Sequence, residues 1–332
     1  MKETIGIIGA NGFVGRHLIE DVRNNYPQYD IVAFVHNIEA GGSGFLGQVK
    51  SIREIDVLNK ESLVKKLQDI DILVYSVKGD NKTIVEGLEN TLEIVEKLRI
   101  KKIIYLSSIV VFGNSPEKEI NEDSPLLMEQ DDLYNMAKVQ AEIIVDRYRK
   151  NGILNIITIR PGYIYGEGGL DHTIYFLDQI KSDFKNFYLP IKGRGIFNGV
   201  YVKNLVRMIM LVIQSQVENK NFNGLDGFLK TWYDLFRAYA GILGKDIDKL
   251  LIKDDSSIIV VSKNIFSRIT AKIKKAFSPN KILISEENYE TYSCQRYYGV
   301  GKAKEILNYF PPFSFQAAIE NIKKWAINNY VK

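Results

Sequence analysis

The sequence predicts an α/β protein in which a doubly wound parallel sheet is joined to a smaller C-terminal α/β lobe. Short apolar runs typical of buried strands recur through the first half of the chain, and segments with apolar residues at helical spacing separate them. Strands that alternate with helices in this way form a parallel sheet with right-handed crossovers. After about residue 165 the alternation fades, which predicts a second and less regular lobe.

The expected elements can be placed by residue number. Strands are expected over residues 4–8, 30–35, 49–55, 71–76, 103–107 and 153–159, with helices beginning near 13, 63, 84 and 132. Later signals predict a helix near 172–182, a strand near Val200, a helix over 204–214 and a helix over 315–329 capped by Ser314. We therefore expect a nucleotide-binding domain over 1–165 and a substrate lobe over 166–332, with a strand and a helix near 196–215 returning to the first domain.

Composition narrows the classes of function. The 332 residues are 45% hydrophobic and 25% charged, as in soluble globular proteins, and the net charge of +4 is too small to indicate nucleic acid as a partner. The apolar runs are too short for an integral membrane segment, and the three histidines lie too far apart to indicate a metal site. The single cysteine, Cys294, excludes an internal disulfide, and the early glycine turn leaves no room for a signal peptide. These features predict a cytoplasmic protein with a small-molecule substrate.

A glycine-rich turn joins the first expected strand to the first expected helix. It reads Gly9-Ala10-Asn11-Gly12-Phe13-Val14-Gly15. A Cβ at Gly9 would obstruct such a turn, one at Gly12 would hold the backbone away from a pyrophosphate, and one at Gly15 would separate helix from strand. The N-terminus of the helix then presents free N–H groups to the phosphates. The pattern predicts a dinucleotide site in a fold of the Rossmann type, against the simpler interpretation of a structural glycine turn.

A phenol and an ammonium share one face of the expected helix over 132–150, because Tyr134 and Lys138 lie four residues apart. Ser107 and Ser108 stand at the end of the expected strand 103–107. With these features the chain resembles the extended short-chain dehydrogenase/reductase family, which includes NAD-dependent epimerases and dehydratases. The resemblance rests on residues 9–15, 107–113, 134–138, 160–166, 201–205 and 301–307.

The resemblance implies an enzyme that moves a hydride to or from a nicotinamide. Tyr134 matches the general acid/base of the family, and Lys138 is expected to lower the pKa of that phenol and to reach the nicotinamide ribose. Ser108 is expected to hydrogen-bond the substrate oxygen, with Ser107 in a structural role.

The resemblance also implies a set of cofactor contacts. Asp56 matches an adenine contact, with helix capping as its alternative role. An acid at the end of the second strand would favour NAD and a base NADP. His36 and Asn37 stand there, which leans slightly towards NADP, although Glu39 could serve NAD. The expected cofactor contacts are Gly9, Asn11, Gly12, Phe13, Val14, Gly15, His36, Asp56, Val57, Ser76, Tyr134, Lys138, Pro161 and Tyr163.

Substrate contacts are expected at Lys78, Tyr165 and His172, from their place in the resemblance. Lys78 follows the fourth strand, where a solvated lysine is an equally good interpretation. Sugar-nucleotide members of the family usually carry an arginine shortly before the strand near Val200, and this chain has Phe197 there.

A basic segment spans residues 256–285, which hold six lysines and arginines and no acidic residue. Within it, residues 262–277 place aromatic and aliphatic side chains at helical spacing. This pattern predicts either a helix that covers the substrate lobe or a lid that makes a peripheral membrane contact.

Three functions fit these observations. The first is an NAD(P)-dependent epimerase or reductase acting on a secondary alcohol or ketone, of a nucleotide sugar in surface polysaccharide synthesis. The second is an NADPH-dependent ketone reductase resembling hydroxysteroid dehydrogenases or dihydroflavonol reductases, which Phe197 and the basic segment favour. The third is a non-catalytic dinucleotide sensor, which has no need of Ser108, Tyr134 and Lys138 together. The resemblance also implies a homodimer through the helices near 82–98 and 132–150.

Overall fold

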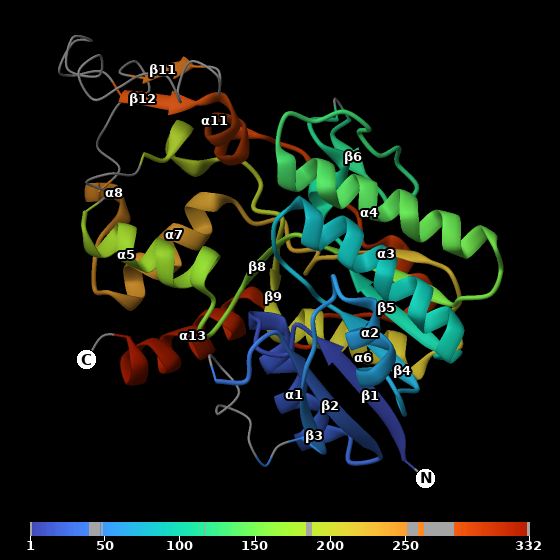
Figure 1. Ribbon diagram of the computed structural model, residues 1–332. Helices are drawn as coiled ribbons and strands as arrows, with labels where there is room; N and C mark the ends of the chain where they lie inside the picture. Colours follow the sequence, from blue (N-terminus) through green and yellow to red (C-terminus); the bar gives the residue numbers. More distant parts are fainter. Residues whose placement is uncertain are drawn as a thin grey trace.

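The structure, a computed structural model, describes residues 2–39, 47, 49–115, 117–183, 188–250, 258–261 and 282–330. Its centre is a seven-stranded parallel sheet in the order β10-β7-β5-β4-β1-β2-β3 (Figure 1). The strands are β1 (Glu3–Ile8), β2 (Tyr29–Val35), β3 (Ser51–Glu54), β4 (Ile72–Tyr75), β5 (Lys102–Leu106), β7 (Ile156–Pro161) and β10 (Asn221–Gly224). The doubly wound sheet predicted from the sequence is confirmed.

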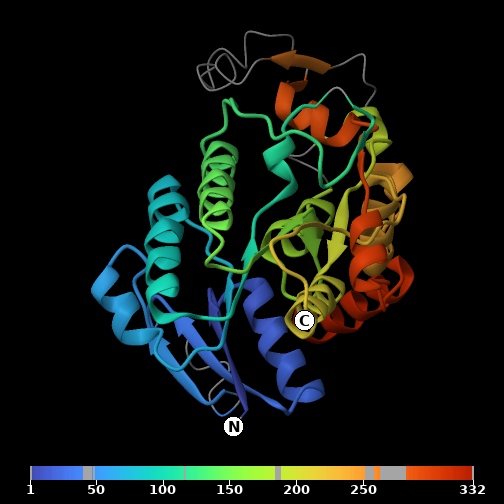
Figure 2. The ribbon, with the colours of Figure 1, turned by 90° about the vertical axis from the view of Figure 1, so that its right-hand side faces the viewer.

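Helices cover both faces of this sheet (Figure 2). One face carries α1 (Phe13–Asn25), α6 (Val202–Gln214) and α12 (Gly301–Leu307), and the other carries α2 (Lys60–Lys66), α3 (Asn81–Leu98) and α4 (Leu133–Lys150). Successive side chains of a strand point to opposite faces. Ile7 therefore packs with the α1 and α6 layer, whereas its neighbour Ile8 packs with the α3 and α4 layer.

The smaller lobe is built around a second apolar core. Its main helices are α5 (Tyr175–Lys181), α7 (Trp232–Ile242), α8 (Ile247–Leu250), α11 (Glu286–Ser293) and α13 (Phe315–Asn329). Short helical turns lie at Ile109–Phe112, Leu170–Ile174 and Pro190–Gly193. The two-stranded sheets pair β8 (Tyr163–Tyr165) with β9 (Gly199–Tyr201), β6 (Glu119–Ile120) with β13 (Tyr297–Tyr298), and β11 (Ile258–Val261) with β12 (Ile282–Ser285). Buried rings of Trp232, Phe236 and Tyr239 fill the core of this lobe.

Most expected elements lie where the sequence placed them. Helix α13 spans the expected residues, and Ser314 caps it by accepting from the Ala317 N–H. The strand near Val200 is β9, which pairs with β8 in a separate two-stranded sheet, so the expectation that this strand returns to the first domain is wrong. Helix α6 does pack on the large sheet, and β10 supplies the seventh strand. Strand β10 reads Asn-Phe-Asn-Gly, with one apolar side chain, and therefore gave no strand pattern. The division at residue 165 stays a prediction.

The part of the chain that the structure describes has neither a membrane-spanning helix nor a cluster of metal ligands. There, none of the helices has the length and apolar character needed to cross a membrane. The same residues hold no cluster of three histidine, cysteine, aspartate or glutamate side chains that could bind a metal ion. The segment 262–277, for which a lid or a membrane contact is expected, lies outside the described residues.

Candidate active site

The glycine turn between β1 and α1 has the close backbone contacts that a dinucleotide site requires. Gly9 has a φ of +89°, a region that favours glycine, and a Cβ there would lie 2.5 Å from the Ser76 carbonyl oxygen. A Cβ at Gly15 would lie 2.4 Å from the Gly9 carbonyl oxygen. The turn therefore packs against the end of β4, and α1 packs directly on the turn.

Polar groups at this turn fit a bound pyrophosphate. The Asn11 Oδ1 atom is buried and has no hydrogen-bond partner among the residues that the structure describes, and as an acceptor it can take a hydrogen bond from a hydroxyl of the cofactor but not from its phosphate oxygens. Gly12 stands at the N-cap of α1 and has no side chain to accept from the first N–H groups of the helix. Uncapped N–H groups at a helix N-terminus bind phosphate well. The residues expected to hold NAD(P) thus fit that group.

Phe13 and His17 connect the turn to the smaller lobe. A Cβ at Gly169 would lie 2.9 Å from the Phe13 ring, so this ring packs closely beneath the loop before α5. His17 Nε2 lies 3.1 Å from the Glu167 carbonyl oxygen, and burial lowers the pKa of the imidazole. Val14, the next expected contact, is buried in the core beneath α1.

The expected adenosine contacts lie on the far side of the sheet from β10. Asp56 is exposed after β3, and its Oδ1 accepts from the Leu58 N–H at 2.9 Å. Helix α2 is capped by Asn59, whose Oδ1 accepts from Ser62, so Asp56 does not have the alternative role of helix cap. Val57 packs beside Gly87 of α3, and His36 is exposed after β2.

The remaining expected cofactor contacts lie at or just beyond the carboxyl ends of strands. Ser76 follows β4, and its Oγ donates to the Ile8 carbonyl oxygen at 3.1 Å. Pro161 ends β7 and is buried. The ring of Tyr163, on β8, is directed into the smaller lobe, where its centroid lies 4.7 Å from that of Trp232.

The fold brings Ser108, Tyr134 and Lys138 to the end of β5. Asp132 caps α4 by accepting from the N–H groups of Tyr134 and Asn135. The Lys138 side chain is buried against β5, and its Nζ donates to the Leu106 carbonyl oxygen at 3.1 Å. The same Nζ lies 5.9 Å from the centroid of the Tyr134 ring. Ser108 follows β5, and its Oγ accepts from the Val110 N–H at 3.3 Å.

Burial controls the pKa of both ionisable members of this group. It lowers the pKa of Lys138 to about 8, and the Glu142 carboxylate opposes that shift. Partial burial raises the pKa of Tyr134, and the Asp171 and Asp132 carboxylates raise it further. The expected lowering of the Tyr134 pKa by Lys138 is therefore not seen: burial of the phenol and the two nearby acids raise this pKa. At neutral pH the phenol is the protonated form, which can donate a proton.

Lys78 lies at this site in an ion pair with the smaller lobe. Its Nζ is 2.8 Å from Asp171 Oδ2, and both side chains are exposed. We expect Asp171→Asn to lower the pKa of Tyr134, because the variant removes an acid that disfavours phenolate and leaves Lys78 unpaired. The tyrosinate absorbance of each protein, minus that of its Tyr134→Phe counterpart, measures the change.

A matched control is Asp183→Asn, which also removes one exposed acid from an ion pair, in that case with Lys245. It is expected to leave the midpoint of Tyr134 in place. Equal midpoints in wild type and Asp171→Asn would show that Asp171 does not act on the phenol.

The other two expected substrate contacts lie in the smaller lobe, where Tyr165 is buried and His172 is half-buried. Tyr165 is 1% exposed, and its hydroxyl donates to Asp226 Oδ2 at 3.1 Å. The His172 Nδ1 lies 3.3 Å from the Ile164 carbonyl oxygen, and burial lowers the pKa of its ring. His172 interacts electrostatically with Asp171 and Lys78, and the role of Tyr165 and His172 in substrate binding stays a prediction.

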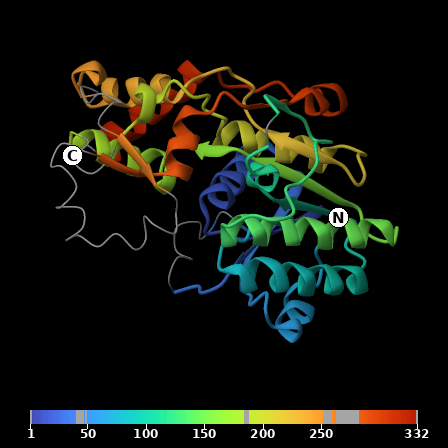
Figure 3. The same cartoon turned by 90° about the horizontal axis from the view of Figure 1, so that it is seen from above.

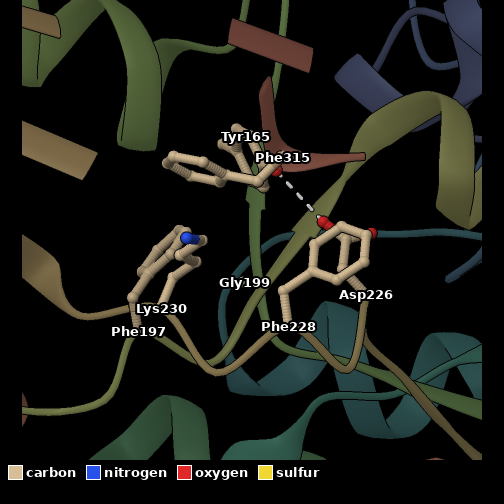
Figure 4. A pocket seen from close by; sticks show the side chains of 7 residues that line it. All are labelled: Tyr165, Phe197, Gly199, Asp226, Phe228, Lys230 and Phe315. Atoms are coloured by element: carbon tan, nitrogen blue, oxygen red, sulfur yellow. Dashed lines mark hydrogen bonds between the residues drawn. The ribbon is translucent and has the colours of Figure 1, made fainter. Parts of the chain in front are cut away.

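A small pocket lies beside Tyr165 (Figure 4). It is lined by Tyr165, Phe197, Gly199, Asp226, Phe228, Lys230 and Phe315. Phe197 is 3% exposed, and its ring centroid lies 4.8 Å from that of Trp232. A Cβ at Gly199 would lie 2.2 Å from the Phe197 ring, so the glycine makes room for this ring. Phe197 is therefore a core side chain of the lobe.

Sequence reasoning missed Arg296, which lies between α11 and β13. Its Nη1 donates to the Gly113 carbonyl oxygen at 3.1 Å, just beyond the helical turn that follows Ser108. Its Nε is buried and has no hydrogen-bond partner among the described residues. Since 183 residues separate Arg296 from Gly113, no local pattern could have placed it there. The guanidinium is therefore held against the end of the helical turn that follows Ser108.

Comparison with known proteins gives a family for this site. Residues 6–231 match the model of the 3-beta hydroxysteroid dehydrogenase/isomerase family. A decarboxylating sterol-4-alpha-carboxylate 3-dehydrogenase of Candida albicans is 24% identical, over 97% of each chain. The N-acetyl-alpha-D-glucosaminyl-diphospho-ditrans,octacis-undecaprenol 4-epimerase of Escherichia coli O157:H7 is 27% identical, over 63% of this chain and 62% of that protein.

Solved structures share the fold over nearly the whole chain. A dTDP-glucose 4,6-dehydratase of Bacillus anthracis, in complex with NAD, has a TM-score of 0.75 and 19% identity, with 99% of this chain and 97% of that chain covered. A UDP-glucose 4-epimerase of Thermotoga maritima has a TM-score of 0.74 and 18% identity, with 98% and 99% covered. These solved structures thus have the same overall fold as this chain.

Proposed function

This chain belongs to the 3-beta hydroxysteroid dehydrogenase/isomerase family of extended short-chain dehydrogenases/reductases, and we propose that it oxidises or reduces a secondary carbinol with NAD(P). The observation that carries this proposal is the meeting of Ser108, Tyr134 and a buried Lys138 at the end of β5. Enzymes of this family are dehydrogenases, epimerases and dehydratases, so the alternative of a non-catalytic sensor is not retained.

Each of the three residues has a role in this reaction. Ser108 Oγ holds the substrate oxygen, and Tyr134 gives a proton to that oxygen in reduction or takes one from it in oxidation. Lys138, as an ammonium, stabilises the phenolate that forms when Tyr134 has given its proton. The nicotinamide, when bound, supplies or accepts the hydride at its C4.

We propose NADP as the preferred cofactor, although the preference is slight. His36 is the first residue after β2 and Asn37 the second, so the end of this strand lacks the acid that would bind the ribose diol of NAD. The nucleotide content of denatured protein, followed by fluorescence titration with NADPH and NADH, tests this. Tightly bound NAD would contradict the preference and indicate an epimerase or dehydratase that recycles its cofactor.

For the substrate, we propose a sugar that a diphosphate links to its carrier, in the synthesis of surface polysaccharide. Arg296 supports this, because its guanidinium contacts Gly113 at the end of the helical turn that follows Ser108 and has an unsatisfied Nε donor. Leu133, 75% exposed, directly precedes Tyr134, and Leu170, 70% exposed, directly precedes Asp171. Tyr134 and Asp171 interact electrostatically, so the two exposed leucines flank the same site. Such apolar surface suits a carrier with a lipid portion, and the Escherichia coli relative acts on a sugar of that kind. A nucleotide carrier is the other form of this substrate.

We expect Arg296→Gln to raise KM for a diphosphate-linked sugar by about 10- to 100-fold, because the variant loses one hydrogen bond between charged groups. Initial rates with UDP-N-acetylglucosamine and with the polyprenyl diphosphate of the same sugar measure the effect and identify the carrier. Arg194→Gln is the matched control, because Arg194 is exposed. An unchanged KM in Arg296→Gln would remove the diphosphate from the proposal.

A second candidate substrate is an apolar ketone or alcohol of the steroid type. Phe197 favours it, because the position where sugar-nucleotide members of the family usually carry arginine is a buried aromatic core here. The relative with the sterol substrate also matches this chain end to end. Oxidation of a 3β-hydroxysteroid with NAD(P), without turnover of either sugar, would select this candidate.

We also propose a homodimer through α3 and α4, which run side by side on one face of the sheet (Figure 3). Ile143 of α4 is 44% exposed there. Light scattering on the wild type and on Ile143→Lys tests this assembly, and equal masses for the two would oppose it. A cytoplasmic location and a peripheral membrane contact through 262–277 stay predictions.

A further inference from the structure

A buried ion pair lies beneath the candidate catalytic residues. Arg160 of β7 donates from Nε to Glu142 Oε1 at 2.9 Å and from Nη2 to Glu142 Oε2 at 2.6 Å. The two side chains are 3% and 4% exposed. The guanidinium also donates to the Glu122 carbonyl oxygen and lies 4.9 Å from the centroid of the Phe112 ring. A carboxylate held by two such bonds is fixed in position.

This carboxylate contacts the segment that presents Ser108. Glu142 Oε1 accepts from Ser107 Oγ at 2.5 Å, and Ser107 directly precedes Ser108 at the end of β5. Glu142 also lies four residues after Lys138 on the buried face of α4, where residues four apart are neighbours. One side chain therefore connects β5, β7 and the helix that carries Tyr134 and Lys138.

Lys138 is surrounded by groups from two elements. Helix α4 contributes Tyr134 and Glu142, and β5 contributes the Tyr105 ring, 5.3 Å from Nζ, and the Leu106 carbonyl oxygen. Arg160 of β7 lies behind Glu142. Burial lowers the pKa of Lys138 to about 8, and Glu142 is the charged group that raises it. Without this carboxylate, less of Lys138 would be an ammonium near neutral pH.

We propose that Glu142 is a positioning residue whose carboxylate, held by Arg160, fixes the Ser107–Ser108 end of β5 and is the negative charge next to Lys138 on the buried face of α4. The role rests on the function proposed above, in which Ser108 and Lys138 act at the substrate and cofactor. An ion pair that only supports the fold would affect stability and leave the titration of Lys138 unchanged.

The test follows the titration of Lys138 in the cofactor-free protein by the ¹³Cε NMR signal of its side chain, which Lys138→Arg assigns. Glu142→Gln is expected to move the midpoint below about 8, by roughly one pH unit or tenfold in the proton-binding constant. That variant leaves buried Arg160 unpaired and is at risk of misfolding. The double variant Glu142→Gln/Arg160→Met replaces both charges by neutral side chains and is expected to show a smaller downward shift, because it also removes the Arg160 cation that lies behind Glu142.

Glu122→Gln is the matched control. Glu122 is also buried and also contacts Arg160, through its backbone carbonyl, but its carboxylate accepts from the Asn223 N–H. Its substitution is expected to leave the midpoint of Lys138 in place. An unshifted midpoint in the double variant, or a shift in the single variant alone, would overturn the role of the Glu142 charge. No substrate enters these measurements, so they stand apart from the outcome of any substrate screen.

Discussion

A Tyr134→Phe variant is expected to bind NAD(P) normally and to lose about 100- to 10,000-fold in kcat, the range typical of a general acid or base. The phenol lies at the exposed end of α4 with the Lys138 ammonium 5.9 Å from its ring centroid. Phenylalanine keeps the ring and removes only the hydroxyl group that carries the proton needed by the reaction. Steady-state rates with the substrate that the screen identifies, beside NADPH titrations of the same preparations, measure the two properties separately.

Tyr148→Phe is the matched control for this variant, because Tyr148 lies on the same helix, near its C-terminal end. It is expected to keep the rate of the wild type. Full activity in Tyr134→Phe would exclude this phenol as the acid/base.

Gly15→Ala is expected to abolish measurable NAD(P) binding and to lower the free energy of unfolding by about 1–3 kcal/mol, as overpacking does in other cores. The new Cβ would lie 2.4 Å from the Gly9 carbonyl oxygen and 2.8 Å from the Ala10 Cα, so α1 must move away from the turn. Chemical denaturation and cofactor titration measure the two losses.

Gly241→Ala is a control with the opposite sign. Gly241 lies in α7, where a Cβ would meet nothing within 4 Å, and alanine in a helix is more stable than glycine by about 0.5–1 kcal/mol. A Gly15→Ala protein that bound NADPH as well as Gly241→Ala does would contradict the close packing of helix and turn.

Local patterns predicted the parts of this protein that depend on neighbours in sequence. The glycine turn is defined by residues at most six positions apart, and Tyr134 and Lys138 lie on one helix. Both features could therefore be predicted from the sequence. The start of helix α13 was predictable from its N-cap residue, Ser314. Helix α7 begins with an equally clear cap, in which Thr231 and Asp234 bond each other reciprocally. This start is also a local signal, although the elements expected from the sequence include no helix there.

Contacts between distant segments could not be predicted in this way. The Lys78–Asp171 pair spans 93 residues and the Arg160–Glu142 pair joins a strand to a helix, so neither leaves a periodic trace. For Tyr165 the sequence alone wrongly suggested exposure. A tyrosine near the start of a substrate lobe is a reasonable candidate for substrate binding, but its hydroxyl is bonded to Asp226 inside the lobe.

Strands β7 and β10 are neighbours in the sheet, yet β8, α5, β9 and α6 lie between them in the chain. The chain therefore leaves the nucleotide-binding part, builds a portion of the lobe, returns through α6 and β10, and leaves again. A fragment cut at residue 165 would expose the backbone edge of β7 and the apolar side of α1 that α6 covers. Grafting the lobe of a relative onto this chain thus needs several junctions.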